Sequence, residues 1–373
     1  MSGEKVLVTG GAGFIGSHVV ELLLAQGNDV RVFDSLVEQV HLGEGPKFVP
    51  AEAEFLLGDV RDRGALANAL KGVDRVVHLA AEVGVGQSMY EISRYVDANT
   101  GGTAVLLDIL ANDSTSVQQI VVASSMSIYG EGSYTCSVHG SIAPRLRPEG
   151  QLKDRQWEPL CPHCGEMLTP VPTSELKPLL PTSVYAISKM DQELLCLSVG
   201  AAYDIGVVAL RYFNAYGPRQ ALSNPYTGVA AIFSGRLLNG RAPMAFEDGQ
   251  QLRDFIHVRD VARATVLALS SEKAKGEAIN VGVGNPLTIV EVANILAREL
   301  GVDLEQEITG KYRAGDIRHC WADPTKAADL LDFSAKVSLK DGVSELVDWV
   351  STQQAQDSGD DAYVELGKRG LAV

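Results

Sequence analysis

The start of the chain carries the pattern that most restricts its fold. A short apolar run, Val6 to Val8, precedes a cluster of glycines, and a second apolar run extends from Val30 to Phe33. Between them, apolar residues recur at helical spacing, and these are Ile15, Val19, Leu22 and Leu23. This order predicts a strand, a tight turn, a helix and a second strand parallel to the first.

The same alternation continues along the chain. Apolar strand patterns occur in "EFLLGD", "DRVVHLAA" and "QQIVVASS", and again in "GVVALRYF", Gly206 to Phe213, and in "EAINVG". Helical patterns begin at about Asp62 and cover Tyr95 to Leu110, and two more lie at 288–300 and 339–350. Strands that alternate with helices predict an α/β fold, with a doubly wound parallel sheet covered on both faces.

The glycines after the first strand form a dinucleotide-binding fingerprint. Gly11, Gly13 and Gly16 have the spacing G-x-G-x-x-G, which lets phosphates approach the backbone and the N-terminus of the following helix. Asp34 ends the second strand, eighteen residues after Gly16. Its carboxylate can accept hydrogen bonds from both ribose hydroxyls and would repel a 2′-phosphate, so the pattern favours NAD over NADP.

A second acidic residue, Asp59 in "GDVRD", follows the third strand pattern. One interpretation places it at the edge of the adenine. The other makes it the N-cap of the helix that begins near Asp62, because aspartate is a preferred N-cap residue.

Tyr185 and Lys189, in "SVYAISK", lie four residues apart, so they share one face of a helix. A phenol has an ordinary pKa of about 10, and a nearby ammonium stabilises the phenolate and lowers that pKa. The pair would then act as a base near neutral pH. By itself the spacing also fits a solvated helix face, and the preceding fingerprint and the strand ending "ASS" favour the functional interpretation.

These residues together resemble the extended short-chain dehydrogenase/reductase group, and within it the NAD-dependent nucleotide-sugar epimerases and dehydratases. The resemblance covers about residues 4–350 apart from a proline-rich insert. Its motifs are "TGGAGFIGSH", "HLAA", "SSMSIYGEG", "YAISK", "LRYFNAYGPRQ", "RDFIHVRDVA" and "RAGDIRHCWAD". The resemblance implies a Rossmann domain, a smaller C-terminal substrate domain and a homodimer.

The resemblance also implies roles for individual residues. Ser125 would hydrogen-bond the sugar O4, Tyr185 would take its proton, and Lys189 would tune Tyr185 and hold the nicotinamide ribose. The residues expected to bind NAD are Gly10, Gly13, Phe14, Ile15, Gly16, Asp34, Ser35, Asp59, Val60, Leu79, Ala80, Ala81, Asn99, Tyr185, Lys189 and Tyr212. Those expected to bind the nucleotide sugar are Ser125, Ser127, Asn214, Arg253, Arg313 and Asp316. A surface ion pair is the other interpretation of each arginine, above all of Arg253 beside Asp254.

The two residues after Ser125 favour epimerisation over dehydration. A 4,6-dehydratase needs an acid and a base to expel water from C6, and that branch of the family has Asp-Glu directly after the catalytic hydroxyl. Here Met126 and Ser127 occupy those positions. A thioether cannot transfer a proton and an alcohol is a poor acid at neutral pH, so we expect C4 inversion through a transient 4-keto sugar.

The sequence constrains the identity of the sugar less than it constrains the type of reaction. The stretches "EVGVGQSMYEI" and "GPRQALSNPYTGV" resemble dTDP-L-rhamnose 4-epimerases more than the UDP-galactose type. Cys320, before Trp321, falls where the family uses side-chain size to gate the sugar pocket. A dTDP-6-deoxyhexose or a UDP-hexose therefore fits. A 4-ketoreductase and a non-catalytic NAD sensor are the alternatives.

Two knuckles of metal-ligating residues lie after Gly130. They are Cys136-x-x-His139 and Cys161-x-x-Cys164, each followed by a glycine. Three thiolates and one imidazole satisfy tetrahedral zinc and leave no open position, so the predicted site is structural. His163 competes with His139 as the fourth ligand, and unliganded thiols are the alternative to a metal.

The zinc site would explain how a long irregular segment is held. Eight of the fifteen prolines lie between Pro144 and Pro181, and a structureless connection of this length is unusual in a compact domain. A metal crosslink can order such a segment. Because it returns to the chain close to Tyr185, we expect the insertion to shape or cover the substrate entrance.

The net charge of the chain distinguishes between two interpretations, an enzyme and a zinc-ribbon protein that binds nucleic acid. The net charge is −15 and the pI about 4.9, and the segment from Cys136 to Pro181 carries five basic and five acidic residues. Neither gives the positive surface that nucleic acid or an anionic membrane requires. We expect a cytoplasmic enzyme whose partner is a nucleotide sugar, with no nucleic-acid or membrane partner.

The expected domains follow from these patterns. Residues 1–130 and 181–210 form the NAD-binding domain, and 131–180 form the zinc-binding insertion. Residues 211–353 form mainly the substrate-binding domain, with some segments returning to the Rossmann sheet. Residues 354–373 show no strong periodicity and are expected to be a loosely held tail.

Overall fold

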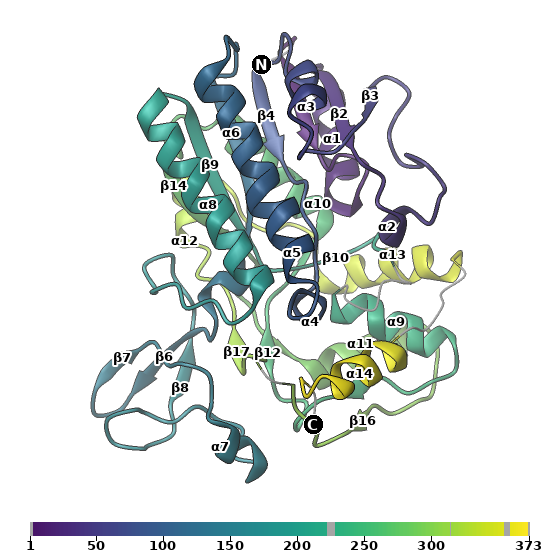
Figure 1. Ribbon diagram of the computed structural model, residues 1–373. Coiled ribbons are helices and arrows are strands. Elements are labelled where there is room, and N and C mark those ends of the chain that lie inside the picture. Colours follow the sequence, from purple (N-terminus) through teal and green to yellow (C-terminus); the bar gives the residue numbers. More distant parts are fainter. Residues whose placement is uncertain (1–2, 222–227, 314, 354–358, 372–373) are drawn as a thin grey trace.

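The computed structural model describes residues 3–221, 228–313, 315–353 and 359–371. Its centre is a seven-stranded parallel sheet with the strand order β14-β9-β5-β4-β1-β2-β3 (Figure 1). The strands are β1 Lys5–Thr9, β2 Asp29–Asp34, β3 Glu54–Leu57, β4 Arg75–His78, β5 Gln119–Ser125, β9 Gly206–Tyr212 and β14 Glu277–Val281. The predicted α/β fold with a large parallel sheet is confirmed.

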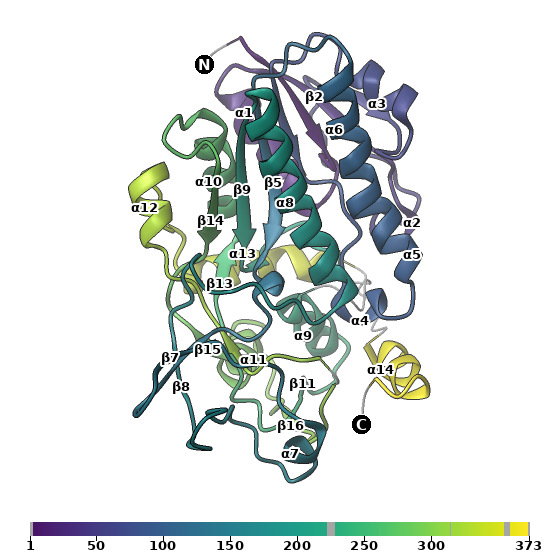
Figure 2. The ribbon, with the colours of Figure 1, turned by 60° about the vertical axis from the view of Figure 1, so that its left-hand side comes forward.

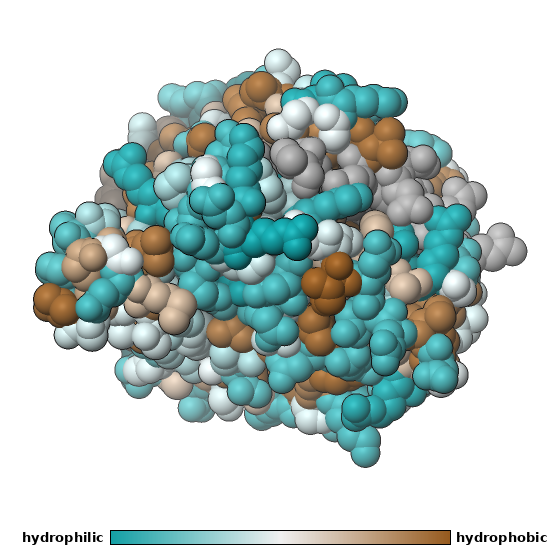
Figure 3. All heavy atoms as spheres, turned by 90° about the horizontal axis from the view of Figure 1, so that it is seen from below, coloured by the Kyte–Doolittle hydropathy of each residue, from teal (hydrophilic) through white to brown (hydrophobic). Residues whose placement is uncertain are grey.

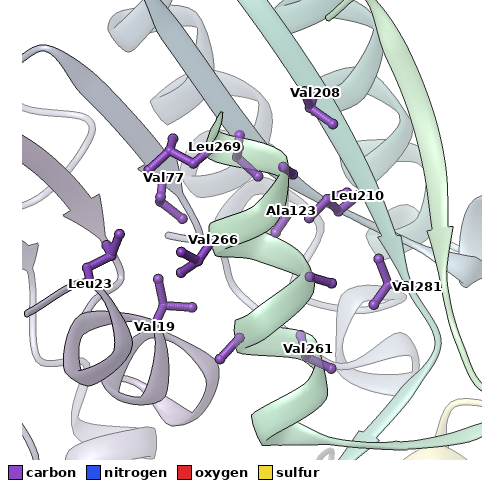
Figure 4. Close-up of a cluster of buried hydrophobic side chains, with 14 of the residues drawn as sticks. Val19, Leu23, Val77, Ala123, Val208, Leu210, Val261, Val266, Leu269 and Val281 are labelled. Carbon is purple, nitrogen blue, oxygen red and sulfur yellow. The ribbon is translucent and has the colours of Figure 1, made fainter. Parts of the chain in front are cut away.

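Helices cover both faces of this sheet (Figure 2). One face carries α1 Phe14–Ala25, α10 Val258–Ser270 and α12 Thr325–Leu331, and the other carries α3 Arg63–Ala69, α6 Gly102–Asn112 and α8 Val184–Tyr203. The strand residues explain this two-sided packing, because Val6 and Val8 of β1 point to one layer and Leu7 to the other. Figure 4 shows the first layer, where Val261, Val266 and Leu269 of α10 lie against the sheet and α1.

The sequence predicts one continuous helix over Tyr95 to Leu110, and the structure divides it. The segments are α5 Ile92–Tyr95, a π-helical turn at Val96–Gly101 and then α6. Short helices elsewhere are α2 Glu38–His41, α4 Val85–Ser88 and a 3₁₀ turn at Met126–Tyr129. π-helical turns occur frequently at functional sites, and this one contains Asn99.

Most of the chain after β9, apart from α10, β14 and α12, lies beyond the carboxyl ends of the sheet strands (Figure 1), and this part is called the C-terminal half below. Its helices are α9 Val229–Leu238, α11 Ile289–Glu299 and α13 Leu339–Ser351, which pack in a third hydrophobic cluster. Its strands form small two- and three-stranded sheets, and they are β10 Asn214–Tyr216, β11 Met244–Ala245, β12 Leu252–Arg253, β13 Phe255–His257, β15 Leu287–Thr288, β16 Glu307–Ile308 and β17 His319–Cys320.

The segment rich in proline projects from this half of the molecule (Figures 1 and 3). It contains a three-stranded sheet in the order β7-β6-β8 and one short helix. These elements are β6 Ser133–Cys136, β7 Gly140–Ile142, α7 Glu149–Lys153 and β8 Thr169–Val171. Its buried cluster consists of Tyr134, Leu168 and two of the cysteines, with Ile142 packed against them.

The prediction of a loosely held tail was wrong for residues 359–371. Gly359–Lys368 form the helix α14, and Leu366 is only 6 % exposed. The guanidinium of Arg369 lies over the ring of Tyr90, 4.2 Å from its centroid. The sequence reasoning missed this helix because its apolar residues are few and find their partners in distant parts of the chain. None of the helices in the described ranges has the length and apolar character that a membrane span requires.

Candidate active site

A cavity of about 720 Å³ lies where the sheet meets the C-terminal half of the chain. Parallel sheets bind ligands outside the carboxyl ends of their strands where the strand order reverses, which here is beside β1 and β4. With one exception, every residue predicted to bind NAD or the nucleotide sugar lines this cavity. The lining residues that were predicted are Gly10, Gly13, Phe14, Ile15, Gly16, Asp34, Ser35, Asp59, Val60, Leu79, Ala80, Ala81, Ser125, Ser127, Tyr185, Lys189, Tyr212, Asn214, Arg253, Arg313 and Asp316.

The glycine loop is as tight as a phosphate-binding turn requires. Gly10 has φ +70°, and a Cβ there would lie 2.8 Å from the backbone nitrogen of Ala80. A Cβ on Gly16 would lie 2.2 Å from the carbonyl oxygen of Gly10. Helix α1 begins at Phe14, and its N-cap Gly13 has no side chain to occupy the first N–H groups. These groups and the positive end of the helix dipole face the predicted position of the pyrophosphate.

Asp34 is held in place at the end of β2. One of its oxygens accepts a hydrogen bond from the backbone N–H of Ala12 at 3.0 Å, and the other accepts one from that of Leu36 at 2.9 Å. Its side chain is 10 % exposed. These bonds leave further lone pairs for a ribose diol, since a carboxylate accepts about four hydrogen bonds.

The two interpretations of Asp59 are separated by the structure. The N-cap of α3 is Asp62, which accepts from the backbone N–H of Ala65 at 3.0 Å. Asp59 lines the cavity and is bound by the guanidinium of Arg61, with an Nη2 to Oδ2 distance of 2.6 Å. The side-chain hydrogen bond from Arg61 lowers the pKa of Asp59. Asp59 is thus a carboxylate at the cavity wall that is paired with Arg61, and its N-cap interpretation was wrong.

Asn99 is the exception among the predicted cofactor residues. It is fully buried and does not line the cavity. Its side chain accepts from the backbone N–H of Glu82 at 2.7 Å and donates to the carbonyl of Glu82 at 3.0 Å and to Ser188 Oγ at 2.9 Å. The π-helical turn thus places Asn99 behind the wall, where it fixes Glu82, a lining residue, and its contact with NAD stays a prediction.

Ser125, Tyr185 and Lys189 meet at the same cavity from two elements. Ser125 ends β5, and its Oγ accepts from Ser127 Oγ at 2.9 Å and from the backbone N–H of Ser127 at 3.2 Å. Tyr185 lies in the first turn of α8, where its backbone N–H donates to Ser88 Oγ at 3.0 Å. The side chains of Tyr185 and Ser125 line the same cavity.

Burial changes the expected acid–base chemistry of this group. It raises the pKa of Tyr185, against the lowering effect of the hydrogen bond with Ser125. Burial also lowers the pKa of Lys189 to about 7, and the Lys189 amine donates to Gln192 Oε1 at 2.6 Å. Both shifts have the same cause, because the loss of water disfavours both charges, and the lowering of the Tyr185 pKa by Lys189 stays a prediction.

The residues expected to bind the nucleotide sugar form the other wall. The guanidinium of Arg253 donates to the carbonyl oxygens of Leu252 and of residues 317 and 318 rather than to a carboxylate. Asp254 is occupied elsewhere by backbone N–H groups, one of them from Gly284 at 2.9 Å. The ion-pair interpretation of Arg253 was therefore wrong. Arg313 does form an ion pair, with Asp316 at 2.8 Å.

The cavity also contains two residues that the sequence reasoning missed, Gln220 and Gln251. Like the predicted Asn214, each has a buried amide oxygen with no hydrogen-bond partner among the described residues. Unpaired buried oxygens are costly, so they indicate positions at which a ligand can donate hydrogen bonds. Gln251 could have been found, since it lies two residues before Arg253 and alternate residues of an extended segment share a face.

The position of Cys320 corrects another expectation. Its thiol is fully buried and does not line the cavity. It packs in a cluster with Met126 and Phe213, which do line it. Any influence of its size on the sugar would pass through those two side chains.

The four residues of the two knuckles form one compact cluster, and their ligand atoms all lie within 4.8 Å of one another. Cys136 Sγ lies 3.6 Å from His139 Nδ1 and 3.7 Å from Cys164 Sγ, and Cys161 Sγ lies 3.6 Å from the same nitrogen. Tetrahedral zinc with Zn–S near 2.3 Å and Zn–N near 2.0 Å places ligand pairs roughly 3.5–3.8 Å apart. The cluster can therefore hold such an ion.

The structure also shows which histidine belongs to the cluster and how the chain turns after each knuckle. His163 lies outside the four, with its ring 5.0 Å from that of His139, so His139 is the imidazole of the cluster. The glycines after each knuckle, Gly140 and Gly165, have φ angles of +71° and +75°. Their predicted tight turns are confirmed, because this backbone region favours glycine.

A parallel sheet with a glycine loop and a Ser, Tyr and Lys group in one cleft defines a dinucleotide-dependent enzyme of the short-chain dehydrogenase/reductase type. The chain belongs to the NAD dependent epimerase/dehydratase family, whose model matches residues 6–145 and 162–282. The interruption of the match falls within the cysteine-bearing insertion.

Individual relatives cover nearly the whole chain. It is 34 % identical to a dTDP-L-rhamnose 4-epimerase of Burkholderia thailandensis, over 95 % of this chain and 96 % of that protein. It is 30 % identical to a dTDP-glucose 4,6-dehydratase of an Actinoplanes species, over 92 % and 97 %.

Solved structures agree with the fold. A UDP-glucose 4-epimerase of Thermotoga maritima with UDP-glucose has a TM-score of 0.77 at 30 % identity and covers 93 % of this chain and 98 % of that one. A UDP-glucuronic acid 4-epimerase of Bacillus cereus with UDP-glucuronic acid and NAD has a TM-score of 0.76 at 28 % identity, over 93 % and 99 %.

Proposed function

We propose that this protein is an NAD-dependent nucleotide-sugar 4-epimerase, an isomerase that inverts C4 through a transient 4-keto sugar. One observation carries the proposal. Ser125, Tyr185 and Lys189 line the same cavity as the glycine loop, and Met126 and Ser127 line it directly after Ser125. The site therefore has the groups needed to oxidise the sugar alcohol to a ketone and to reduce that ketone again. At positions 126 and 127 it has no carboxyl group that could help to expel water.

The cavity divides into a cofactor half and a substrate half. The glycine loop, Asp34 and Asp59 suit an NAD pyrophosphate, ribose and adenine, while Asn214, Arg253 and other residues of the C-terminal half suit the nucleotide diphosphate. We assign the sheet and its helices to cofactor binding and residues 211–353 mainly to substrate binding, with β14 returning to the sheet. The guanidinium of Arg253 can bind phosphate oxygens in a forked geometry.

The chain's own residues hold and move the proton of the sugar O4. Ser125 Oγ, already bound to Ser127, orients the sugar hydroxyl, and Tyr185 exchanges the proton with O4. A bound NAD⁺ would supply reversible hydride transfer at C4 of the sugar. The charge of the bound nicotinamide would favour the phenolate that burial alone disfavours. Lys189 holds the nicotinamide ribose and supplies the neighbouring positive charge.

The substrate that the relatives favour is a dTDP-6-deoxyhexose resembling dTDP-L-rhamnose, and a UDP-hexose is the second candidate. The identity to the Burkholderia 4-epimerase, over nearly the full length of both chains, supports the first. The Actinoplanes dehydratase keeps a 4,6-dehydratase as the alternative reaction. The observation that separates them is the pair of residues after Ser125.

Incubation with a panel of dTDP- and UDP-sugars, followed by NMR of the sugar C4 proton, tests this function. We expect C4 inversion with no net consumption of NAD. A product with a 4-keto, 6-deoxy sugar would identify a dehydratase instead. Stoichiometric oxidation of added NADH or NADPH would identify a 4-ketoreductase, and no hydride exchange with any sugar would identify an NAD sensor.

We further propose that Cys136, His139, Cys161 and Cys164 bind a structural zinc ion. Three of the distances between ligand atoms, 3.6, 3.6 and 3.7 Å, fit tetrahedral coordination, and four protein ligands would leave no position for substrate. None of the five cysteines forms a disulfide, which suits the cytoplasmic location that we assign. The homodimer implied by the family resemblance remains a prediction that gel filtration with light scattering tests.

Zinc content provides a direct check of the metal site. The purified protein should contain one zinc per chain, because structural zinc binds with an apparent free energy of about 10–16 kcal/mol. Cys136→Ser should lose the ion, as measured by atomic emission. Cys196→Ala is the matched control, since Cys196 is buried in α8 away from the cluster. A wild-type protein that carries no zinc after expression in zinc-supplemented medium would contradict the site.

A further inference from the structure

Both the insertion and the cavity contact one short stretch of chain, residues 316–320, which we call the bridging segment. Asp316 and Ile317 line the cavity. Further along, the carbonyl of His319 accepts from the backbone N–H of Gly132 at 2.8 Å. None of the described residues from 131 to 180 lines the cavity itself. The insertion is therefore not part of the cavity wall, and an effect on the shape of the substrate site would pass through the bridging segment.

On the cavity side, the bridging segment positions Arg253. Arg253 Nη2 donates to the carbonyl of Ile317 at 2.7 Å, and Nη1 donates to that of Arg318 at 2.9 Å. Strand β12, which contains Arg253, also pairs with β17 of the bridging segment. The place of this guanidinium in the cavity is thus fixed by two carbonyl oxygens of the segment.

On the other side, the insertion binds the same stretch of backbone. The carboxylate of Glu131 accepts from the backbone N–H of Arg318 at 2.8 and 2.9 Å and from that of His319 at 3.3 Å. Arg147 Nη2 donates to the carbonyl of Asp316 at 3.2 Å. Consecutive peptide groups of the segment are therefore bound by the insertion and by Arg253.

Buried charges make this connection stiff. The side chains of Arg147 and Arg318 are 2 % and 1 % exposed, and both bind Glu247, which is 3 % exposed, at 2.8 and 2.9 Å. Glu158 of the insertion binds Arg318 at 2.7 Å and His319 at 2.9 Å. Displacing one member would leave a buried charge without its partner, so the network tolerates little movement.

The cysteine cluster fixes the ends of the loop that carries these charges. Arg147 and Glu158 both lie between His139 and Cys161, which belong to the two knuckles. The insertion's own hydrophobic cluster is small. A metal that joins the two knuckles would add a crosslink at the ends of this loop, beside the pairing of β6 with β8, and its removal would increase the loop's conformational freedom.

We propose that the zinc-binding insertion positions the nucleotide-diphosphate subsite, by holding the bridging segment and through it Arg253. Arg147 and Glu131 are then positioning residues that never touch the substrate. This inference rests on the proposed function and on its zinc site. It explains how a projecting segment, absent from the wall of the cavity, can control substrate affinity.

The experiment compares Arg147→Met, Arg147→Lys and Cys164→Ser with the wild-type protein. Calorimetric titration with dTDP and with UDP gives the nucleotide affinity, and initial rates give KM and kcat for the sugar that the wild type inverts. Bound NAD and the thermal transition are measured on each sample. Lys153→Met is the matched control, because Lys153 lies on α7 of the same insertion, is 61 % exposed and pairs with Glu149 at the surface.

We expect Arg147→Met and Cys164→Ser to raise the nucleotide Kd and KM at least tenfold with NAD content unchanged and kcat within about threefold. Arg147→Lys should recover part of the affinity, because it keeps the charge but loses the fork. Lys153→Met should match the wild type. Should a variant fail to fold, chelation and reloading of zinc on the wild-type protein gives the same comparison.

The outcomes separate this inference from the function on which it rests. A wild-type protein that binds neither dTDP nor UDP would overturn the proposed function and the inference with it. Folded, zinc-free protein or Arg147→Met that binds the nucleotide as tightly as the wild type would overturn the inference alone. An equal fall of kcat and of NAD content would also overturn it, since it would indicate general loss of structure.

Discussion

Replacing Tyr185 with phenylalanine is expected to lower kcat for C4 inversion by about 10²–10⁴-fold, the usual contribution of a positioned acid or base. The substitution removes only the hydroxyl, while the ring can keep its edge-to-face contact with Tyr95, whose centroid lies 6.4 Å away. Cofactor content should therefore remain at the wild-type level. Rates are measured by NMR with the preferred sugar, and NAD by absorbance after denaturation.

The control for this variant is Tyr203→Phe. Tyr203 is the last residue of the same helix, α8, and is 53 % exposed, so the same chemical change is made outside the cavity. It should leave kcat and KM unchanged. Inversion by Tyr185→Phe at the wild-type rate would remove Tyr185 from the mechanism and leave Ser125 as the only hydroxyl of the group.

The large sheet could be predicted because its signals are local. Apolar runs such as Val6 to Val8 and helical stripes such as that of α1 depend on neighbours in sequence, and parallel pairing follows from their alternation. The cavity residues could be predicted for a related reason, since strand ends of a parallel sheet meet at one edge. The fingerprint glycines and Ser125 occur at such ends.

The features that were missed depend on contacts between distant segments. Asn99 turns away from the cavity because a π-helical turn, which has no simple sequence signal, directs it to Glu82. Helix α14 has few apolar residues, and its Leu366 is buried against remote parts of the chain. The pKa of Tyr185 could not be predicted from its spacing to Lys189, because spacing says nothing about burial.

Lys189 illustrates the same limit in more detail. The spacing of Lys189 and Tyr185 along α8 suggests that the lysine ammonium interacts with the tyrosine phenol. The amine of Lys189 instead donates a hydrogen bond to Gln192, three residues further on. Gln192 is itself fixed, since its Nε2 donates to Thr103 Oγ1 at 2.7 Å. The buried amide of Gln192 therefore orients the amine of Lys189. The i,i+3 spacing of Lys189 and Gln192 was the sequence signal that could have predicted this contact.

Replacing Gly16 with alanine is expected to lower the free energy of unfolding by about 1–3 kcal/mol, the usual cost of an added group in a packed region. The new Cβ would lie 2.2 Å from the carbonyl oxygen of Gly10 and 2.7 Å from Gly11 Cα. Both are backbone atoms of the cofactor loop and cannot rotate away. The loop must shift, so NAD affinity should fall at least tenfold, or about 1.4 kcal/mol.

Helix propensity makes the opposite prediction for this position. Gly16 lies within α1, where alanine is ordinarily more stable than glycine by about 0.5–1 kcal/mol. Gly13→Ala provides the comparison, because its Cβ would meet only the Gly10 carbonyl, at 3.4 Å, and its φ of −76° suits alanine. We expect Gly13→Ala to keep the wild-type thermal stability. If Gly16→Ala is instead more stable than the wild type and retains NAD, the close approach of α1 to the loop does not determine cofactor binding.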